Sequence, residues 1–333
     1  MFLLSRTAHL SAARLGFRAY ATKNPLPAAF LRGGTSKGIY INQKELPPNP
    51  SEWHDIFLGI MGSPDSSGRQ LNGMGGGISS LSKICVVGPP TVPNADVDYA
   101  FAQVGIKDAV IDYAGNCGNL SCMIGVFAVD EGLVSAGSTS SKVVRAYNTN
   151  TKKIIQTTFP LTDGVADLGR DELPIAGVAR KGSAISMEFL DPAGAKTGKL
   201  LPAGSSTVEL TYADDRPAVR ASLVDATNPT VFVEDLDGAL ADQAQVAEVL
   251  RQEGAKRMGL DWRVASQPKI AFIRPTDSGI AIKAYSMGVM HKAVPMTVAL
   301  CLGVTANVEG TIAYGMLQER NQEGIVEISH PGG

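Results

Sequence analysis

Two segments of the chain are apolar on every side when they are read as helices. In 119–133, apolar residues recur at positions 120, 123, 124, 127 and 128, and Cys122, Val126 and Val129 fill the other side. In 293–304, the same spacing recurs from Val294 to Leu302, with further apolar residues on the remaining sides. A helix without a polar face has to be covered all round. This feature predicts two similarly built α/β domains, each a β-sheet wrapped around a central buried helix.

Each of these apolar segments is preceded by a short motif of small and polar residues. The first motif is Gly115–Asn119 (GNCGN), and the second is Ser286–Lys292 (SMGVMHK). The first N–H groups of a helix have no partner within the helix, so a cap or a ligand has to meet them. If the two helix starts faced each other across a cleft, they would form a site for a compact anion with several carboxylates.

Shorter patterns supply the remaining elements of the two domains. Helices are expected at 52–62 and 240–258, and strands at 28–41 (two strands around a turn), in the second half of 78–87, and at 141–147, 153–159, 184–190, 206–212, 219–224, 230–234, 268–274 and 280–285. Residues 191–204 are rich in turn formers and mark a boundary. We therefore expect an α/β (α+β) protein with an N-terminal domain over 24–188 and a C-terminal domain over 189–333.

The two ends of the chain differ from its body. Residues 1–22 are rich in arginine, and no acidic residue precedes Glu45. That composition is typical of a mitochondrial transit peptide and predicts a location in the matrix, with a disordered N-terminal extension as the alternative. At the other end, two glycines close the chain soon after the strand-like run GIVEI (324–328). This ending leads us to expect a C-terminal domain that is truncated in a turn.

Composition excludes several classes of function. Of the 333 residues 44% are hydrophobic, which excludes a disordered chain, and the net charge of −2 gives no footprint for nucleic acid or an anionic membrane. No apolar run reaches the roughly 18 residues of a spanning helix. Four cysteines are too few for a disulfide framework and lack zinc-ribbon spacing. A small-molecule partner and a reducing surrounding are therefore expected.

The common cofactor motifs fail on inspection. A dinucleotide fingerprint that began at Gly73 would need glycine at position 78, which is Ile78, and Gly198-Lys199 is followed by Leu200 instead of the Ser or Thr of a P-loop. The four histidines form no spaced cluster with cysteines or carboxylates, and no GxSxG elbow occurs. We therefore expect neither a metal nor a cofactor.

Two residues remain as candidates for chemistry. Cys117 lies at the expected start of the first buried helix, where the helix field favours a thiolate and small neighbours admit a substrate. Cys85, Cys122 and Cys301 lie inside apolar runs and are expected to be buried and inert. Lys83 opens a β-prone run, on the same side of the strand as Cys85. A surface lysine is the ordinary alternative, but desolvation in a closed cleft would make Lys83 a base near neutral pH.

A series of longer motifs resembles a known family. The motifs are LRGGTSKGIYI, LNGMGGGISSLSKICVV, AGNCGNLSCMIGVFAVDEGLV, DPAGAKTGKLLPAG, SLVDATNPTVFV, SMGVMHKAVPMTVAL and ISHPGG, in this order. They resemble the PrpF family, which includes methylaconitate, methylitaconate and aconitate isomerases and oxalomesaconate tautomerase. The resemblance runs from about residue 28 to the C-terminus, and it implies the fold of diaminopimelate epimerase, with two α/β domains and the active site between them.

The resemblance also implies the residues of the site. Lys83 matches the family's lysine proposed as the acid/base group, and Cys117 matches the cysteine at the helix start. Residues implied to hold the substrate carboxylates are Arg32, Ser36, Gly75, Gly76, Gly77, Ser79, Ser82, Asn116, Gly118, Asn119, Ser286, Met287 and Gly288. A second catalytic cysteine of the epimerase type has no counterpart, because Cys301 falls deep inside its helix.

The function implied by the resemblance is a cofactor-independent isomerase. It would shift a double bond, or change its geometry, in an unsaturated di- or tricarboxylate such as aconitate or 2-methylaconitate, by removing a proton beside a carboxylate and returning one at the allylic position. A keto-enol tautomerase of the oxalomesaconate type, a methylitaconate isomerase, and an inactive ligand-binding paralogue are the alternatives. The oligomeric state stays open, with a homodimer among the options.

Overall fold

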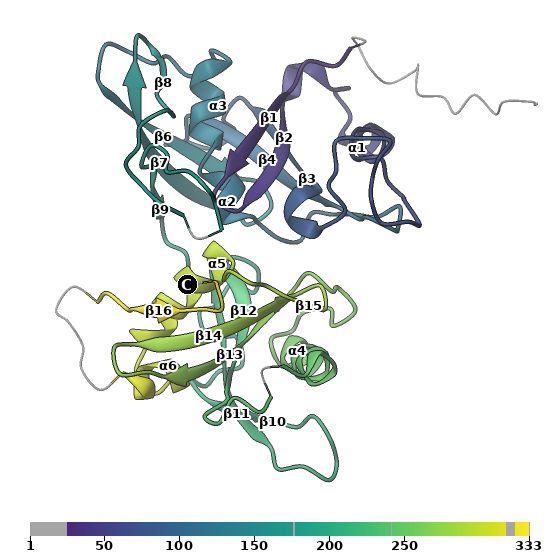
Figure 1. Cartoon of the computed structure of the whole chain (residues 1–333), viewed down its shortest axis with the longest axis vertical. Helices are drawn as coiled ribbons and strands as arrows, with labels where there is room; N and C mark the ends of the chain where they lie inside the picture. The colour runs from purple at the N-terminus through teal and green to yellow at the C-terminus, as the bar shows by residue number, and fades with distance from the viewer. Residues whose placement is uncertain (1–24, 176, 241, 318–323, 333) are drawn as a thin grey trace, which may run out of the picture.

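The computed structural model describes residues 25–175, 177–240, 242–317 and 324–332, which form two sheets, one above the other in Figure 1. Residues 1–22, to which the transit-peptide prediction applies, lie outside the described residues. The first sheet and its helices comprise β1 (Ala29–Gly33), β2 (Ser36–Asn42), η1 (Gln43–Glu45), η2 (Pro50–Glu52), α1 (Trp53–Met61), η3 (Ser79–Leu81), β3 (Lys83–Gly88), β4 (Val97–Val104), β5 (Ile111–Asp112), α2 (Gly118–Ser121), α3 (Ile124–Asp130), β6 (Ser141–Asn148), β7 (Lys153–Thr162), β8 (Val165–Ala166) and β9 (Ser186–Phe189).

The second sheet has fewer strands than the first but a similar arrangement of strands and helices. Its elements are β10 (Val208–Leu210), β11 (Val219–Ala226), β12 (Asn228–Glu234), α4 (Ala244–Arg257), β13 (Lys269–Pro275), β14 (Ile280–Ser286), β15 (Val289–Met290), α5 (Met296–Ala306), α6 (Ile312–Met316) and β16 (Ile328–Ser329). In the first sheet β3 lies between β2, its parallel neighbour, and β4, its antiparallel neighbour. In the second sheet β13 lies in the same way between parallel β12 and antiparallel β14. The two sheets therefore contain the same arrangement of three neighbouring strands.

An apolar helix lies against one face of each sheet, as predicted; the first is buried on every side, whereas α5 is exposed at Leu300. Leu120, Ile124 and Phe127 of α2 and α3 pack with Tyr40, Cys85 and other inward residues of the first sheet. Residues of α5 pack in the same way with β11, β12, β13 and β14 of the second sheet. The opposite faces are covered by α1 and α4, which are partly exposed. The expected α+β class with two similar domains is confirmed, and alternate residues of β3 and β13 pack on opposite faces.

The element boundaries differ from expectation where hydrogen bonding overrides periodicity. The first central helix is broken at Cys122 and Met123 into α2 and α3, because the Met123 N–H donates to the Leu120 carbonyl three residues back (3.1 Å) in a tighter turn than that of an α-helix. The second helix begins at Met296, three residues later than expected, because Pro295 forces the residue before it out of helical geometry.

Other departures concern elements without a clear pattern. The strand β4 was not expected, because its Asp98 and Gln103 are buried through hydrogen bonds to Thr91 and Lys83 and so break the alternation of apolar residues. The helix α6 is too short to show a period. The run 324–328 forms strand only at its end, where β16 pairs with β14.

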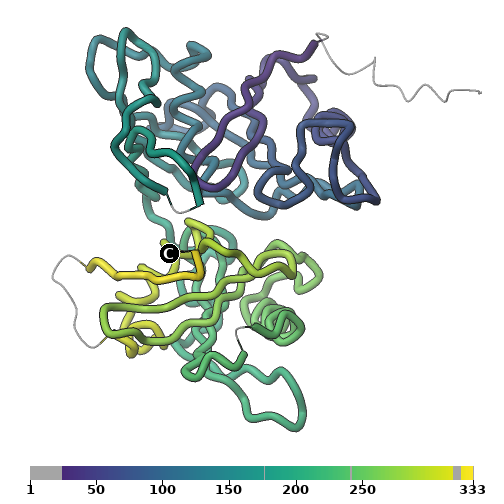
Figure 2. The backbone as a smooth tube through the Cα atoms, viewed as in Figure 1, coloured from purple at the N-terminus to yellow at the C-terminus, as the bar shows by residue number. Residues whose placement is uncertain are grey.

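The chain passes from the first sheet to the second through 190–207, which carries no strand or helix in the described structure (Figure 2). Within this stretch the Gly194 N–H donates to the Asp225 carbonyl (2.7 Å), and the Lys196 ammonium reaches back to the Asn150 carbonyl (3.1 Å). The segment 190–207 therefore contacts both sheets. The domain division at 188/189 stays a prediction.

The turn between β1 and β2 is pressed against the start of α2, and this contact yields a prediction on stability. A Cβ atom on Gly33 would lie 1.7 Å from the Asn119 carbonyl oxygen, so Gly33→Ala has to push the hairpin off the helix. We expect Gly33→Ala to lower the free energy of unfolding by at least about 1–3 kcal/mol in chemical denaturation.

Gly303 provides the matched control. It lies within α5 and a Cβ there would meet nothing within 4 Å, so Gly303→Ala should raise the free energy of unfolding by about 0.4–1 kcal/mol. Equal effects of the two substitutions would contradict the tight contact at Gly33.

Candidate active site

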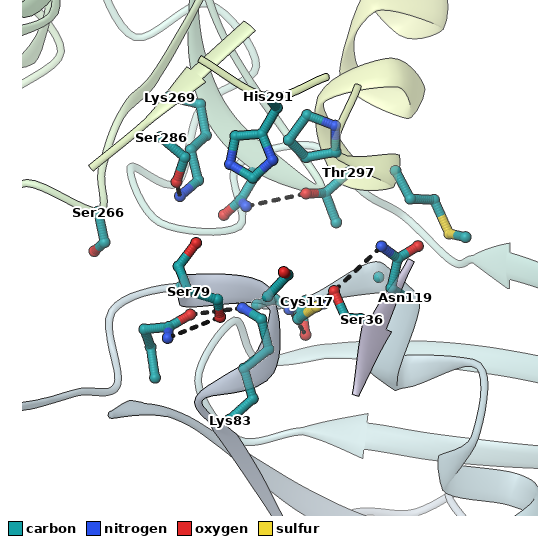
Figure 3. A pocket seen from close by; sticks show the side chains of 18 of the residues that line it. Ser36, Ser79, Lys83, Cys117, Asn119, Ser266, Lys269, Ser286, His291 and Thr297 are labelled. Atoms are coloured by element: carbon teal, nitrogen blue, oxygen red, sulfur yellow. Dashed lines mark hydrogen bonds between the residues drawn. The ribbon is translucent and has the colours of Figure 1, made fainter. Parts of the chain in front are cut away.

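The described residues enclose a cavity between the two sheets, where the starts of α2 and α5 meet. A Cβ atom on Gly118 would lie 3.2 Å from both Met296 and Thr297, so the two helix starts are in direct contact. Figure 3 shows the side chains of the two domains facing each other across this space. The site residues expected from sequence that line the cavity are Lys83, Cys117, Ser36, Ser79, Asn116, Gly118, Asn119, Ser286 and Met287.

Lys83 projects into the cavity from the first residue of β3. Its side chain is almost fully buried, and its ammonium donates to the Gln103 side-chain oxygen at 2.5 Å. The ammonium also lies 5.1 Å from the centre of the Phe101 ring. None of these partners is a carboxylate, so Lys83 is held in place by neutral groups.

Cys117 is the residue that precedes the first turn of α2. Its thiol lies 3.8 Å from the Ser36 hydroxyl, and its backbone N–H donates to the Asn116 side-chain oxygen (2.8 Å). The Asn119 amide donates to the hydroxyls of Thr35 (3.0 Å) and Ser36 (3.4 Å). These contacts join the β1–β2 turn to the start of α2 and form a polar wall beside Lys83.

The second domain contributes cationic and polar groups that the sequence analysis did not single out. Lys269, the first residue of β13, donates to the Ser286 hydroxyl at 2.5 Å. Burial, and then the charge of Lys83, lower the pKa of Lys269 to about 8. Burial and both lysines also lower the pKa of His291 to about 4, so its ring is neutral near pH 7. The signal for Lys269 was available: it opens an apolar strand after a proline, as Lys83 opens one after a serine.

Two buried polar atoms at the cavity have no hydrogen-bond partner in the described structure. They are the Asn116 side-chain amide nitrogen and the Ser266 hydroxyl, and both residues are less than one tenth exposed. Unpaired buried polar atoms are costly and call for an explanation. Together with Lys83 and Lys269, against the single carboxylate Asp112 among the lining residues, they favour a polar, anionic ligand.

Several residues that the resemblance implied do not line this cavity. Gly75, Gly76 and Gly77 pack instead against Gln70, Leu81 and the Gly68 backbone, where a side chain would not fit. These glycines lie in the loop that precedes β3.

Arg32, Ser82 and Gly288 also lie elsewhere. The Arg32 side chain is exposed and donates to the Gly34 carbonyl (2.8 Å), next to a separate cavity beside Cys122. The Ser82 hydroxyl donates to the Val104 carbonyl (3.0 Å). Gly288 occupies the turn between β14 and β15 with φ of 73° and does not line the cavity.

The three other cysteines are buried, as expected. Burial raises the pKa of Cys122 and of Cys301 to about 12, and that of Cys85 well above its ordinary value. Cys301 lies in the middle of α5, away from the cavity. None of the three is in position to act as a second catalytic thiol.

Two features are absent from the described residues. No three side chains of His, Cys, Asp or Glu gather there as they would around a metal ion. No helix in this part of the chain is long and apolar enough to cross a membrane.

Comparisons with known proteins agree on one family. The family model described as PrpF protein matches residues 23–333. The chain is 36% identical to a 3-methylitaconate isomerase of Eubacterium barkeri, over 92% of this chain and 88% of the relative, and 32% identical to a 2-methyl-aconitate isomerase of Cupriavidus necator, over the same shares. Among solved structures, the crystal structure of a methylitaconate-delta-isomerase matches with a TM-score of 0.75 and 33% identity, covering 92% of this chain and 87% of that one.

The lowered pKa of Lys269 predicts how its removal changes stability with pH. An unfolded lysine titrates near pH 10.4, whereas Lys269 in the folded chain titrates at about 8. Between these values the unfolded chain binds a proton that the folded chain does not, so stability falls as the pH is lowered, and the penalty is complete below about pH 8. Lys269→Met should therefore raise the melting temperature near pH 7, with a gain that vanishes above about pH 10.5.

Lys283→Met is the control for this measurement. Lys283 lies on β14 of the same sheet and pairs with Asp242 (2.8 Å) near the surface, so its removal should bring no gain at either pH. A melting temperature of Lys269→Met that lies below the wild type by the same amount at both pH values would contradict the burial of a costly charge.

Proposed function

The chain belongs to the PrpF family, and from this premise we propose that it is an isomerase of an unsaturated di- or tricarboxylate of the aconitate, methylaconitate or methylitaconate type. The reaction moves the double bond of the substrate or changes the geometry of that bond. The observation that carries the proposal is Lys83: a nearly buried lysine, held only by neutral groups, in a polar cavity between two domains.

The chemistry needs few parts. An amine removes a proton from the carbon next to the double bond, and the electrons of the broken C–H bond form the new double bond. The electrons of the old double bond then take a proton at its far carbon. The adjacent carboxylate accepts part of the developing negative charge, so cationic and N–H groups around it lower the barrier. The reaction removes one proton and adds another while the double bond moves, and it calls for no redox partner.

Cys117 and its neighbours are proposed to position the substrate. The thiol, the Ser36 hydroxyl and the Asn119 amide form one polar wall, and the unpaired Asn116 amide and Ser266 hydroxyl offer further hydrogen bonds from the two sides. A substrate with two or more carboxylates would satisfy these groups together with the two lysines. A methyl group more or less is a matter of cavity shape, so a panel of acids is needed to identify the substrate.

The proposal is tested by incubating the protein in deuterated water with cis- and trans-aconitate, 2-methylaconitate, methylitaconate and oxalomesaconate, followed by proton NMR. We expect a new isomer and incorporation of deuterium with at least one acid, and a loss of about 10²-fold or more in Lys83→Met. Lys153→Met, on β7 of the same sheet and outside the cavity, serves as control.

The outcomes separate the alternatives. Exchange limited to the keto-enol acid oxalomesaconate would assign a tautomerase. Binding of these acids without exchange or isomerisation would assign a ligand-binding protein and overturn the proposal, as would full activity of Lys83→Met.

A mitochondrial location is a separate proposal, supported by the basic, acid-free composition of residues 1–22 and by a family match that begins at residue 23. Fusion of residues 1–30 to a fluorescent protein should direct it to mitochondria, and changing Arg6, Arg14 and Arg18 to Glu should abolish the targeting. A fusion that stays outside mitochondria would contradict this location.

A further inference from the structure

Lys83 and Lys269 occupy the same place in the two domains. Each is the first residue of an interior strand of its sheet, β3 or β13. Each of these strands has a parallel neighbour on one side and an antiparallel neighbour on the other. The two lysines are therefore related by the repeated plan of the sheets, although the sequence shows no repeat.

The alternation of side chains along a strand places both lysines on the inner face. Cys85 and Val87 of β3 pack against α2 and α3, so Lys83, two residues earlier, points to the same side. Ala271 and Ile273 of β13 pack against α5, and Lys269 follows the same rule. Because the starts of α2 and α5 meet between the domains, both ammonium groups enter one cavity, from opposite sides in Figure 3.

The hydrogen bonds of the two lysines repeat as well. Lys83 donates to Gln103, its partner across the antiparallel pair with β4, and Lys269 donates to Ser286 on the antiparallel neighbour β14. Both acceptors are neutral. No ion pair in the described part of the chain includes either lysine.

Two like charges in one enclosed cavity repel each other, so the charge of one ammonium makes the proton of the other easier to remove. The lowered pKa of Lys269, caused by burial and by the charge of Lys83, agrees with this. An allylic proton shift can use two groups, a neutral amine that accepts a proton at one carbon and an ammonium that donates one at the other.

We propose that Lys269 is a second catalytic lysine, which exchanges a proton with the carbon at the opposite end of the allylic unit from the carbon served by Lys83. This inference rests on the proposed isomerase function. The lone pair of the neutral amine takes the proton of one carbon, the C–H electrons form the new double bond, and the electrons of the old double bond take a proton from the other ammonium. One lysine gains the proton that the other loses, and proton exchange with water, or the reverse reaction, resets the pair.

The experiment compares the wild type with Lys83→Met, Lys269→Met and Lys283→Met, on each isomer of the acid that the wild type converts. Proton NMR in deuterated water measures deuterium incorporation into unconverted substrate separately from formation of the other isomer. With the isomer that Lys83 deprotonates as substrate, we expect Lys269→Met to incorporate deuterium at a rate within about tenfold of the wild type. Formation of the other isomer should fall by about 10²-fold or more. Lys83→Met should show the same split when the reaction starts from the other isomer.

A role of Lys269 in binding alone gives a different result. Loss of a carboxylate contact lowers incorporation and isomer formation by the same factor and raises KM, and this parallel loss would overturn the inference. Lys269→Arg keeps the charge but cannot give up its proton near neutral pH, so it should restore KM without restoring isomer formation.

Controls keep the two proposals apart. If the wild type neither incorporates deuterium nor forms an isomer with any acid, the proposed function fails, and the second lysine fails with it. If the wild type is active and Lys269→Met forms isomer at the wild-type rate, only the second lysine is refuted. Lys283→Met should behave as the wild type, and if Lys269→Met does not fold, Lys269→Arg carries the same comparison.

Discussion

The contact between the starts of the two central helices is the constraint on which the site depends. Gly118 of α2 lies against Met296 and Thr297 of α5 so closely that a Cβ atom would be 3.2 Å from both. Thr297 is in turn fixed from its own domain, where its carbonyl accepts from Thr227 (2.7 Å) and its hydroxyl from Asn228 (3.1 Å). Because each helix packs on its own sheet, joining the two starts fixes the relative position of the strands whose first residues carry the lysines.

The electrostatics of the cavity follow from this arrangement. Each of the two sheets contributes one lysine and one neutral hydrogen-bond acceptor to the cavity. A surface ion pair would hold a lysine fully protonated, whereas burial beside a like charge disfavours the second proton. The site therefore combines attraction for carboxylates with a group able to exchange protons near neutral pH, and burial and the charges of both lysines keep the His291 ring neutral.

Much of the fold could be predicted from the sequence, and about half of the site. Lys83 and Cys117 follow from a lysine opening an apolar strand and a cysteine at a helix start, and both line the cavity. Lys269 carries a similar local signal, but only the strand order shows that it faces Lys83. The glycines of 75–77 suggested a ligand loop, yet glycine serves close packing as readily as ligand binding, and here they pack against Gln70, Leu81 and Gly68.

The sequence by itself determined that there are two buried helices, that each needs a sheet around it, and that no strong charge or cofactor motif points to a large partner. These are local properties, because periodicity and composition act over a few turns of chain. The tertiary structure decided which polar residues meet. Lys83 and Lys269 are 186 positions apart in the sequence, and their common cavity exists only because two separately packed cores dock with their helix starts in contact.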